Sequence, residues 1–183
     1  MKHTTMKNTT FYFILTLLFT FTACTDDDDN GNNGDGPNVG ANEITFDISG
    51  AVEGEKSGAS YVVIVQDFSY LISSNDGTSS SDQTFSLVFH KSFDDGNASA
   101  NPAPGTYPIG TVGDLMDQDG FWVVYSDTQN NQEFGGQNVD GTLTITSNSN
   151  NQLKGTFEFS AGSYEGSEGT ITVTNGSFSA AID

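Results

Sequence analysis

Apolar and polar residues alternate over most of the chain after residue 42, and this period of two constrains the fold most strongly. Ile44, Phe46 and Ile48, for example, are each flanked by polar residues. Successive side chains of a strand point to opposite faces, so such a run predicts a strand with one buried face. No ten-residue window carries a convincing helical stripe. The same alternation recurs in residues 85–90, 121–126, 142–146 and 156–160.

Turns rich in Gly, Asn and Asp separate these runs and indicate about eight or nine short strands, which is typical of an antiparallel sandwich or barrel. We predict a β-sandwich, because strand lengths vary and the loops are unequal. A lipocalin-like β-barrel is the alternative. Residues 61–65 are apolar at every position, which predicts a more central strand.

The C-terminal segment changes parity. Its apolar residues lie on odd positions up to Val173 and on even positions from Phe178. A regular strand cannot do this without turning its apolar side outward. Asn175-Gly176 lies at the change, so we expect either a tight hairpin there or a bulge at Gly176.

An apolar run of about 13 residues ends just before Cys24 and follows the positive residues Lys2 and Lys7. It is too short to cross a bilayer core of roughly 30 Å comfortably, so residues 1–23 are predicted to be a signal peptide. Residues 24–41 are acidic and rich in Gly and Asn, and they predict a flexible tether. Residues 42–183 form the predicted all-β domain.

Thr22-Ala23-Cys24 resembles the end of the lipobox of bacterial lipoproteins, although Phe21 stands where that family usually has Leu. The resemblance implies that Cys24, the only cysteine, carries a lipid such as palmitate and becomes the new N-terminus. The residues after it resemble the acidic export signal of some Gram-negative lipoproteins, which implies an outer-membrane protein facing the cell exterior. A solvated acidic tether on a periplasm-facing protein is the alternative. The acidic residues are Asp26, Asp27, Asp28 and Asp29.

The net charge is −19, and a chain beginning at Cys24 would have 3 lysines and 24 acidic residues, or −21. Nucleic acid is a poor partner for such a chain, because phosphate neutralisation needs clustered Lys and Arg. One cysteine permits no internal disulfide. The predicted partners are the membrane, through the lipid anchor, and a glycan or a protein.

Three segments of the last 45 or so residues are similar to those of exported all-β lipoproteins without assigned active residues. The shared traits are a threonine-rich strand, a G-T-F-x-F strand and a final T-N-G-x-F. The resemblance implies an all-β fold and transfers no active residue. The segments are residues 141–146, 155–159 and 174–178.

Asp114, Asp117 and Asp119, followed by Gly120, suggest calcium as a ligand, since hard cations take clustered oxygen ligands. The spacing does not match an EF-hand loop, and a solvated acidic turn is the favoured interpretation. No other cofactor is indicated.

Catalysis has little support in the sequence. His90 is the only histidine after Cys24, and no G-x-S-x-G motif occurs. One histidine also makes a zinc site improbable. A pair of carboxylates would suffice for a glycosidase, but the sequence nominates none. We therefore expect a non-catalytic binding or accessory module, with a structural surface protein and a carboxylate-dependent hydrolase as alternatives.

Trp122, the only tryptophan, is a candidate for stacking on a ligand, together with Tyr125. The alternation places Trp122 on the strand face opposite Phe121 and Tyr125. Packing of Trp122 in a second core layer is the favoured interpretation. Solvent exposure beside a groove would instead indicate a binding site.

Overall fold

Nine β-strands make up the described part of the chain, which comprises residues 40–65, 69–92, 102–164 and 168–182 in this computed structural model. The signal segment, Cys24 and the aspartates from Asp26 to Asp29 lie outside the described residues. Within those four ranges, no helix is long and apolar enough to cross a membrane. The strands are β1 (Glu43–Gly50), β2 (Gly54–Val65), β3 (Ser69–Asn75), β4 (Phe85–Lys91), β5 (Gly105–Ile109), β6 (Phe121–Asp127), β7 (Gln132–Ser149), β8 (Gln152–Ser163) and β9 (Thr170–Ile182).

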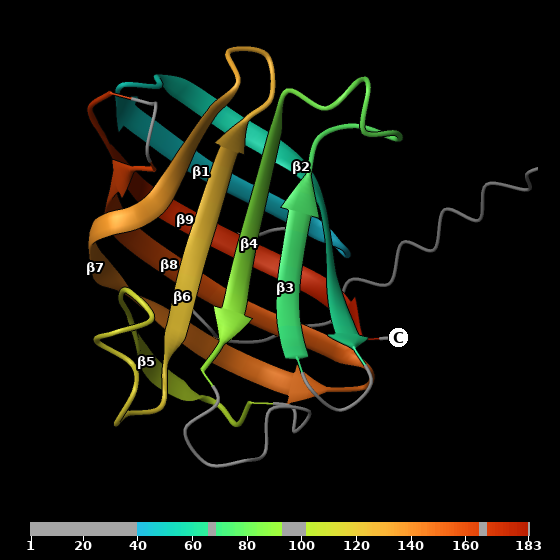
Figure 1. Ribbon diagram of the computed structural model, residues 1–183. Coiled ribbons are helices and arrows are strands. Elements are labelled where there is room, and N and C mark those ends of the chain that lie inside the picture. Colours follow the sequence, from blue (N-terminus) through green and yellow to red (C-terminus); the bar gives the residue numbers. More distant parts are fainter. Residues whose placement is uncertain (1–39, 66–68, 93–101, 165–167, 183) are drawn as a thin grey trace, which may run out of the picture. The chain divides into compact units, whose positions relative to one another are not determined.

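The strands form one closed barrel in the order β1-β2-β3-β4-β6-β5-β7-β8-β9, and β9 pairs with β1 to complete the ring. Figure 1 looks onto β3, β4 and β6, with β1, β8 and β9 crossing behind them. The all-β prediction is confirmed, but the predicted sandwich is wrong and the barrel alternative is correct. The unequal strand lengths do not reflect two sheets, because the long strands β7, β8 and β9 bend around the barrel.

A bulge in β9 explains its change of parity. β9 runs without a break from Thr170 to Ile182, so the bulge prediction is confirmed and the hairpin is wrong. Asn175 adopts a φ of 53°, and the pairing of β9 shifts register at this point against both neighbours, β1 and β8. Val173 and Phe178 both remain in the core, with exposures of 1% and 2%. One extra residue therefore keeps both halves of the strand facing inward.

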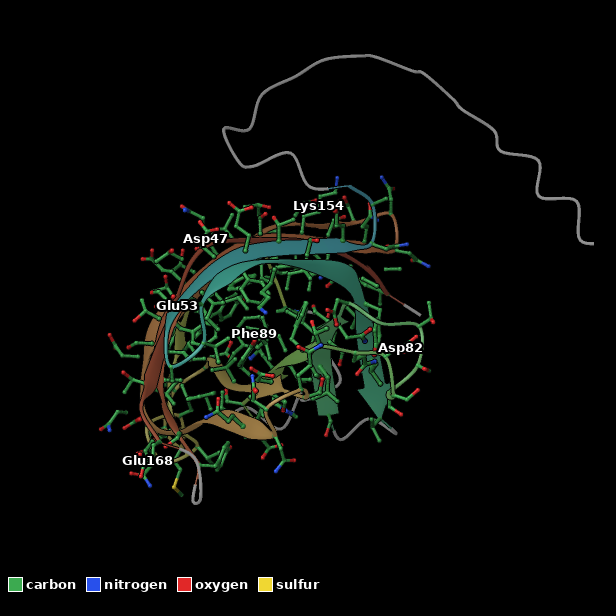
Figure 2. The ribbon with its side chains drawn as sticks, turned by 90° about the horizontal axis from the view of Figure 1, so that it is seen from above. Asp47, Glu53, Asp82, Phe89, Lys154 and Glu168 are labelled. Atoms are coloured by element: carbon green, nitrogen blue, oxygen red, sulfur yellow. The ribbon has the colours of Figure 1, made fainter. Side chains whose placement is uncertain are left out.

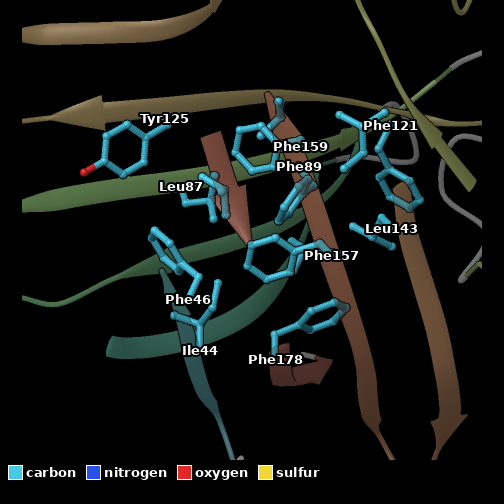
Figure 3. Close-up of a cluster of buried hydrophobic side chains, with 14 of the residues drawn as sticks. Ile44, Phe46, Leu87, Phe89, Phe121, Tyr125, Leu143, Phe157, Phe159 and Phe178 are labelled. Atoms are coloured by element: carbon cyan, nitrogen blue, oxygen red, sulfur yellow. The ribbon is translucent and has the colours of Figure 1, made fainter. Parts of the chain in front are cut away.

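Aromatic rings fill the barrel interior. Phe157 lies at their centre, with ring centroids 5.0 Å from Phe89, 5.9 Å from Phe46 and 6.3 Å from Phe178 (Figure 3). Most of these pairs are tilted or edge-on, the geometry that aromatic quadrupoles favour. The alternation read from the sequence is the alternation between this core and the outer surface.

Most charged side chains of the strands lie on the outside of the barrel, whereas Lys91 and Asp127 are buried. Figure 2 shows Phe89 in the interior, with Asp47 and Lys154 on the outer side of the wall. Residues 61–65 do not form a strand covered on both faces. Only Val62 is fully buried there, whereas Tyr61, Ile64 and Val65 are 38%, 37% and 45% exposed. Tyr61 and Val65 lie on the outer face of the strand, whereas Ile64 has the parity of Val62 and pairs with the buried Tyr70. The apolar residues of the outer face make that surface the place to look for function.

Candidate functional site

Twelve outward positions on β2, β3, β4 and β6 form a regular grid without a charged side chain, and Glu55, near the start of β2, lies outside this grid. The register aligns them in three rows of four, one residue from each strand in that order. We call this grid the uncharged face. Its first row is Val63, Leu71, His90 and Trp122; its second is Tyr61, Ser73, Val88 and Val124; its third is Ala59, Asn75, Ser86 and Ser126.

The other side of the barrel has a different chemistry. The outward positions of β1, β7, β8 and β9 are rich in threonine and carry most of the charged residues of the strands. On a chain with a net charge of −19, an uncharged area of this size is a marked departure from the average surface. These charged outward residues are Glu43, Asp47, Asp140, Lys154 and Glu158. Glu133, at the start of β7, instead lies opposite Ser126 at the end of the third row and accepts a 3.4 Å hydrogen bond from its hydroxyl.

A stacked pair of rings dominates the first row. His90 and Trp122 lie opposite each other on β4 and β6, with centroids 3.6 Å apart and planes within 5° of parallel. Burial lowers the pKa of His90 to about 4, because desolvation disfavours the imidazolium. The imidazole is therefore neutral at pH 7, and the face has no charge there. The stack also holds the indole of Trp122 in one orientation.

Acidification from pH 7 to pH 5 is expected to destabilise the barrel by about 1–2 kcal/mol through His90. An unfolded histidine takes up a proton near pH 6.5, whereas the folded His90 stays neutral until about pH 4. The unfolded state binds more protons across this window, so stability falls as the pH falls. The His90→Phe variant keeps a ring against Trp122 and should lose this slope in urea unfolding.

Comparing the unmutated chain with His90→Phe isolates the titration of His90, because its cross-strand neighbours, Leu71 and Trp122, do not ionise. Carboxylates with a lowered pKa, such as Asp82 at about 2, where hydrogen bonds from Ser79 favour the charged form, contribute stability above their ordinary pKa. The stability that these carboxylates contribute is lost only at a pH below the window from pH 7 to pH 5. Equal slopes for wild type and His90→Phe between pH 7 and pH 5 would contradict the assignment.

Trp122 and Tyr125 do not lie together. Trp122 is partly buried on the outer face, whereas Tyr125 is fully buried inside the barrel. Its ring contacts Phe85 and Phe46, its hydroxyl has no hydrogen-bond partner, and burial raises its pKa. Tyr125 is thus a core residue, and the prediction that it contacts a ligand at the surface is wrong. Trp122 remains the stacking candidate.

Asp114, Asp117 and Asp119 lie in the turn between β5 and β6 but do not converge on a shared point. Asp114 accepts hydrogen bonds from the backbone N–H and the hydroxyl of Thr111, at 3.1 Å and 2.5 Å, which lower its pKa. Asp119 forms an ion pair with Lys91. Nowhere in the described ranges do three His, Cys, Asp or Glu side chains gather in a way that could hold a metal ion. The turn thus gives the calcium hypothesis no support.

Lys91 points into the barrel. It has the parity of Phe85, Leu87 and Phe89, and it is only 6% exposed. Its ammonium group pairs with Asp119 and lies 5.6 Å from the ring centroid of Tyr107 and 5.8 Å from that of Phe121. This pair fixes the turn that carries Asp119 to the end of β4. In the sequence, the signal that Lys91 points inward is that it has the same parity as the core residues of its strand.

A groove of about 440 Å³ contains a pair of facing carboxylates on β1 and β2. Asp47 and Glu55 lie directly opposite each other, and the side-chain amide of Asn175 donates a 2.7 Å hydrogen bond to Asp47. Both acids stand on the same open wall, where Glu55 is exposed and Asp47 is half-buried, so neither is enclosed as a general acid usually is. The lining residues are Thr45, Phe46, Asp47, Glu55, Lys56, Ser57 and Asn175.

Neither the groove nor the face is explained by a known relative. Comparisons with family models, curated proteins and solved structures gave no match. The function must therefore be argued from these residues themselves. Of the two candidate sites, the groove is small, and its charged and polar lining resembles the rest of this acidic surface. The uncharged face differs from that surface because it lacks charged side chains.

Most of the uncharged face was not predicted, although the sequence carries its signal. Residues 61–65 are apolar on both faces, and the strands around Val88 and Val124 also place apolar residues at outward positions. The first of these patterns predicts a more central strand. In such an acidic chain, the absence of acidic residues from the outward positions of these three runs marks them as different from the rest of the strands.

Proposed function

We propose that this chain is a lipid-anchored surface lipoprotein whose barrel acts as a non-catalytic binding module. The observation that carries the proposal is the uncharged face. Exposed apolar patches of a few hundred Å² are frequently interaction sites in soluble proteins. Elsewhere on this barrel, the outward side chains are mostly polar or charged, as the threonines and acidic residues on β7, β8 and β9 illustrate.

The two alternatives receive less support. A structural surface protein without a ligand gains nothing from an uncharged face, since charge keeps such a protein soluble. A carboxylate-dependent hydrolase needs two acids that flank a bond from different sides. Asp47 and Glu55 instead stand side by side on neighbouring strands, and Asn175 already binds Asp47.

The proposed address rests on the N-terminal sequence. A lipid on Cys24 would hold the chain in the outer membrane, since each buried methylene group adds about 0.8 kcal/mol and several acyl chains make anchoring stable. The acidic run that follows Cys24 supports a location facing the cell exterior. A tether of residues 24–41 would let the barrel reorient and present its uncharged face to ligands.

The anchor predicts how the precursor is processed in a bacterial host. The unmutated chain should incorporate labelled palmitate, and the Cys24→Ala variant should not. Globomycin, which blocks the peptidase that cleaves lipidated precursors, should leave the precursor of about 19.4 kDa uncut. Normal processing under globomycin, or no label on the unmutated chain, would overturn the proposed anchor.

A lysine in the middle of the uncharged face should abolish binding. Val88→Lys places a cation in the second row, where desolvating it would oppose any ligand that covers the face. The matched control is Thr172→Lys, which makes the same change of charge at an exposed position of β9. Both variants would be screened with the unmutated chain on arrays of glycans, peptides and lipid vesicles.

We expect at least one ligand of the unmutated chain to be lost in Val88→Lys and kept in Thr172→Lys. Melting temperatures of the three proteins establish that the variants fold. If every ligand behaves the same in both variants, or if none binds the unmutated chain, the proposed binding role is wrong.

A further inference from the structure

The rows of the uncharged face differ in chemistry in an ordered way. The first row is aromatic and aliphatic and ends in the stacked His90 and Trp122. Apart from Ala59, the third row is built from hydroxyl and amide groups, with Asn75 donating a 3.3 Å hydrogen bond to the Tyr61 hydroxyl. A ligand lying across the rows would meet apolar surface on one side and neutral hydrogen-bonding groups on the other.

The size of the face argues against a folded partner. Strands lie about 4.8 Å apart and outward residues recur about every 6.8 Å, so the grid covers roughly 400 Å². A stable protein interface needs about 800 Å² from each partner. A second copy of this chain would also bring another net charge of −19 close to the first. The area suits a short, extended ligand instead.

Charge narrows the class of that ligand. The face holds no cation that could pair with a phosphate, sulfate or carboxylate, and the neutral His90 supplies none at pH 7. None of its twelve side chains is an anion either, and the carboxylate of Glu133 beside the third row is bound by the Ser126 hydroxyl. A neutral imidazole offers one donor and one acceptor, and serine hydroxyls offer both. Sugar rings match this pattern, because they have apolar C–H surfaces and hydroxyl groups around their edges.

From this arrangement we infer that the uncharged face binds a neutral oligosaccharide, with Trp122 packing against a sugar ring and Ser86 and His90 exchanging hydrogen bonds with its hydroxyls. This inference rests on the proposed binding role and names its ligand. Trp122 is held ready by the stack with His90, so little side-chain order has to be gained on binding.

The test uses the full chain on an array of neutral and acidic glycans, followed by titration calorimetry with the best neutral oligosaccharide. Binding should be specific to neutral glycans and nearly independent of salt, since no ion pair forms. Trp122→Ala should weaken binding roughly tenfold or more, and Trp122→Phe should weaken it less. Thr144→Ala, on the outward side of β7, is the control and should bind like the unmutated chain.

Binding to acidic glycans alone, a steep salt dependence, or unchanged affinity in a folded Trp122→Ala variant would overturn the inference. So would the absence of any glycan signal. If Val88→Lys abolishes binding of a peptide or of vesicles while no glycan binds, the binding role stands and the saccharide assignment fails.

Discussion

Replacing Phe157 with alanine is expected to lower the free energy of unfolding by about 3–5 kcal/mol. The side chain is 4% exposed and contacts four other rings, so its removal leaves a cavity that the closed barrel cannot collapse to fill. The rings around Phe157 come from β1, β4, β8 and β9, and the loss is therefore felt on both sides of the barrel. These rings belong to Phe46, Phe89, Phe159 and Phe178.

Urea unfolding followed by circular dichroism measures the effect. The neighbouring Thr156→Ala is the matched control, because Thr156 points outward from the same strand and should change stability by less than about 1 kcal/mol. If Phe157→Ala does not fold, Phe157→Leu retains more of the volume and should show a smaller loss. A loss below about 1 kcal/mol for Phe157→Ala would mean that the described core is incorrect.

Gly176→Ala is expected to destabilise the barrel by about 3 kcal/mol or to prevent folding. A Cβ at this position would lie 2.5 Å from the Cδ2 atom of Phe157 and 2.5 Å from its carbonyl oxygen. The ring has core neighbours on several sides, and the carbonyl belongs to a paired strand, so neither can move away cheaply. The glycine after the bulge thus lets β9 approach β8 closely.

The adjacent residue provides the control. Asn175 has a φ of 53°, which glycine adopts without strain, so Asn175→Gly keeps the bulge and loses only the side-chain bond to Asp47. Its effect should stay within about 1 kcal/mol. Thermal unfolding of the two variants would contradict this view of the bulge if Gly176→Ala were as stable as Asn175→Gly.

The sequence predicted the strands well because alternation is a local property. Phe85, Phe121 and Phe157 could each be assigned to the core from their own neighbours, and the parity change after Val173 located the bulge of β9. The closure of the barrel could not be predicted in the same way. It depends on β1 pairing with both β2 and β9, and parity says which face a residue occupies but not which strand lies beside it.

The candidate site was predicted only in part, for the same reason. Trp122 was a candidate because it is the only tryptophan, and its strand face was assigned correctly. Its stack with His90 depends on the antiparallel register of β4 and β6, which brings together two residues whose positions in the chain, 90 and 122, differ by 32. The assignment of Tyr125 to the same ligand contradicted its parity, and the structure buries it.

The double pairing of β1 has a mechanical consequence for a protein held by its N-terminus. Tension from an anchor at Cys24 would enter the barrel at the Glu43 end of β1. Because β1 is bonded along one edge to β2 and along the other to β9, pulling it out loads both ladders in shear at once. Many backbone hydrogen bonds then share the force, instead of breaking one after another as in unzipping. If the chain is anchored through its N-terminus as we propose, this double pairing would help the barrel to stay folded while a bound ligand pulls on it.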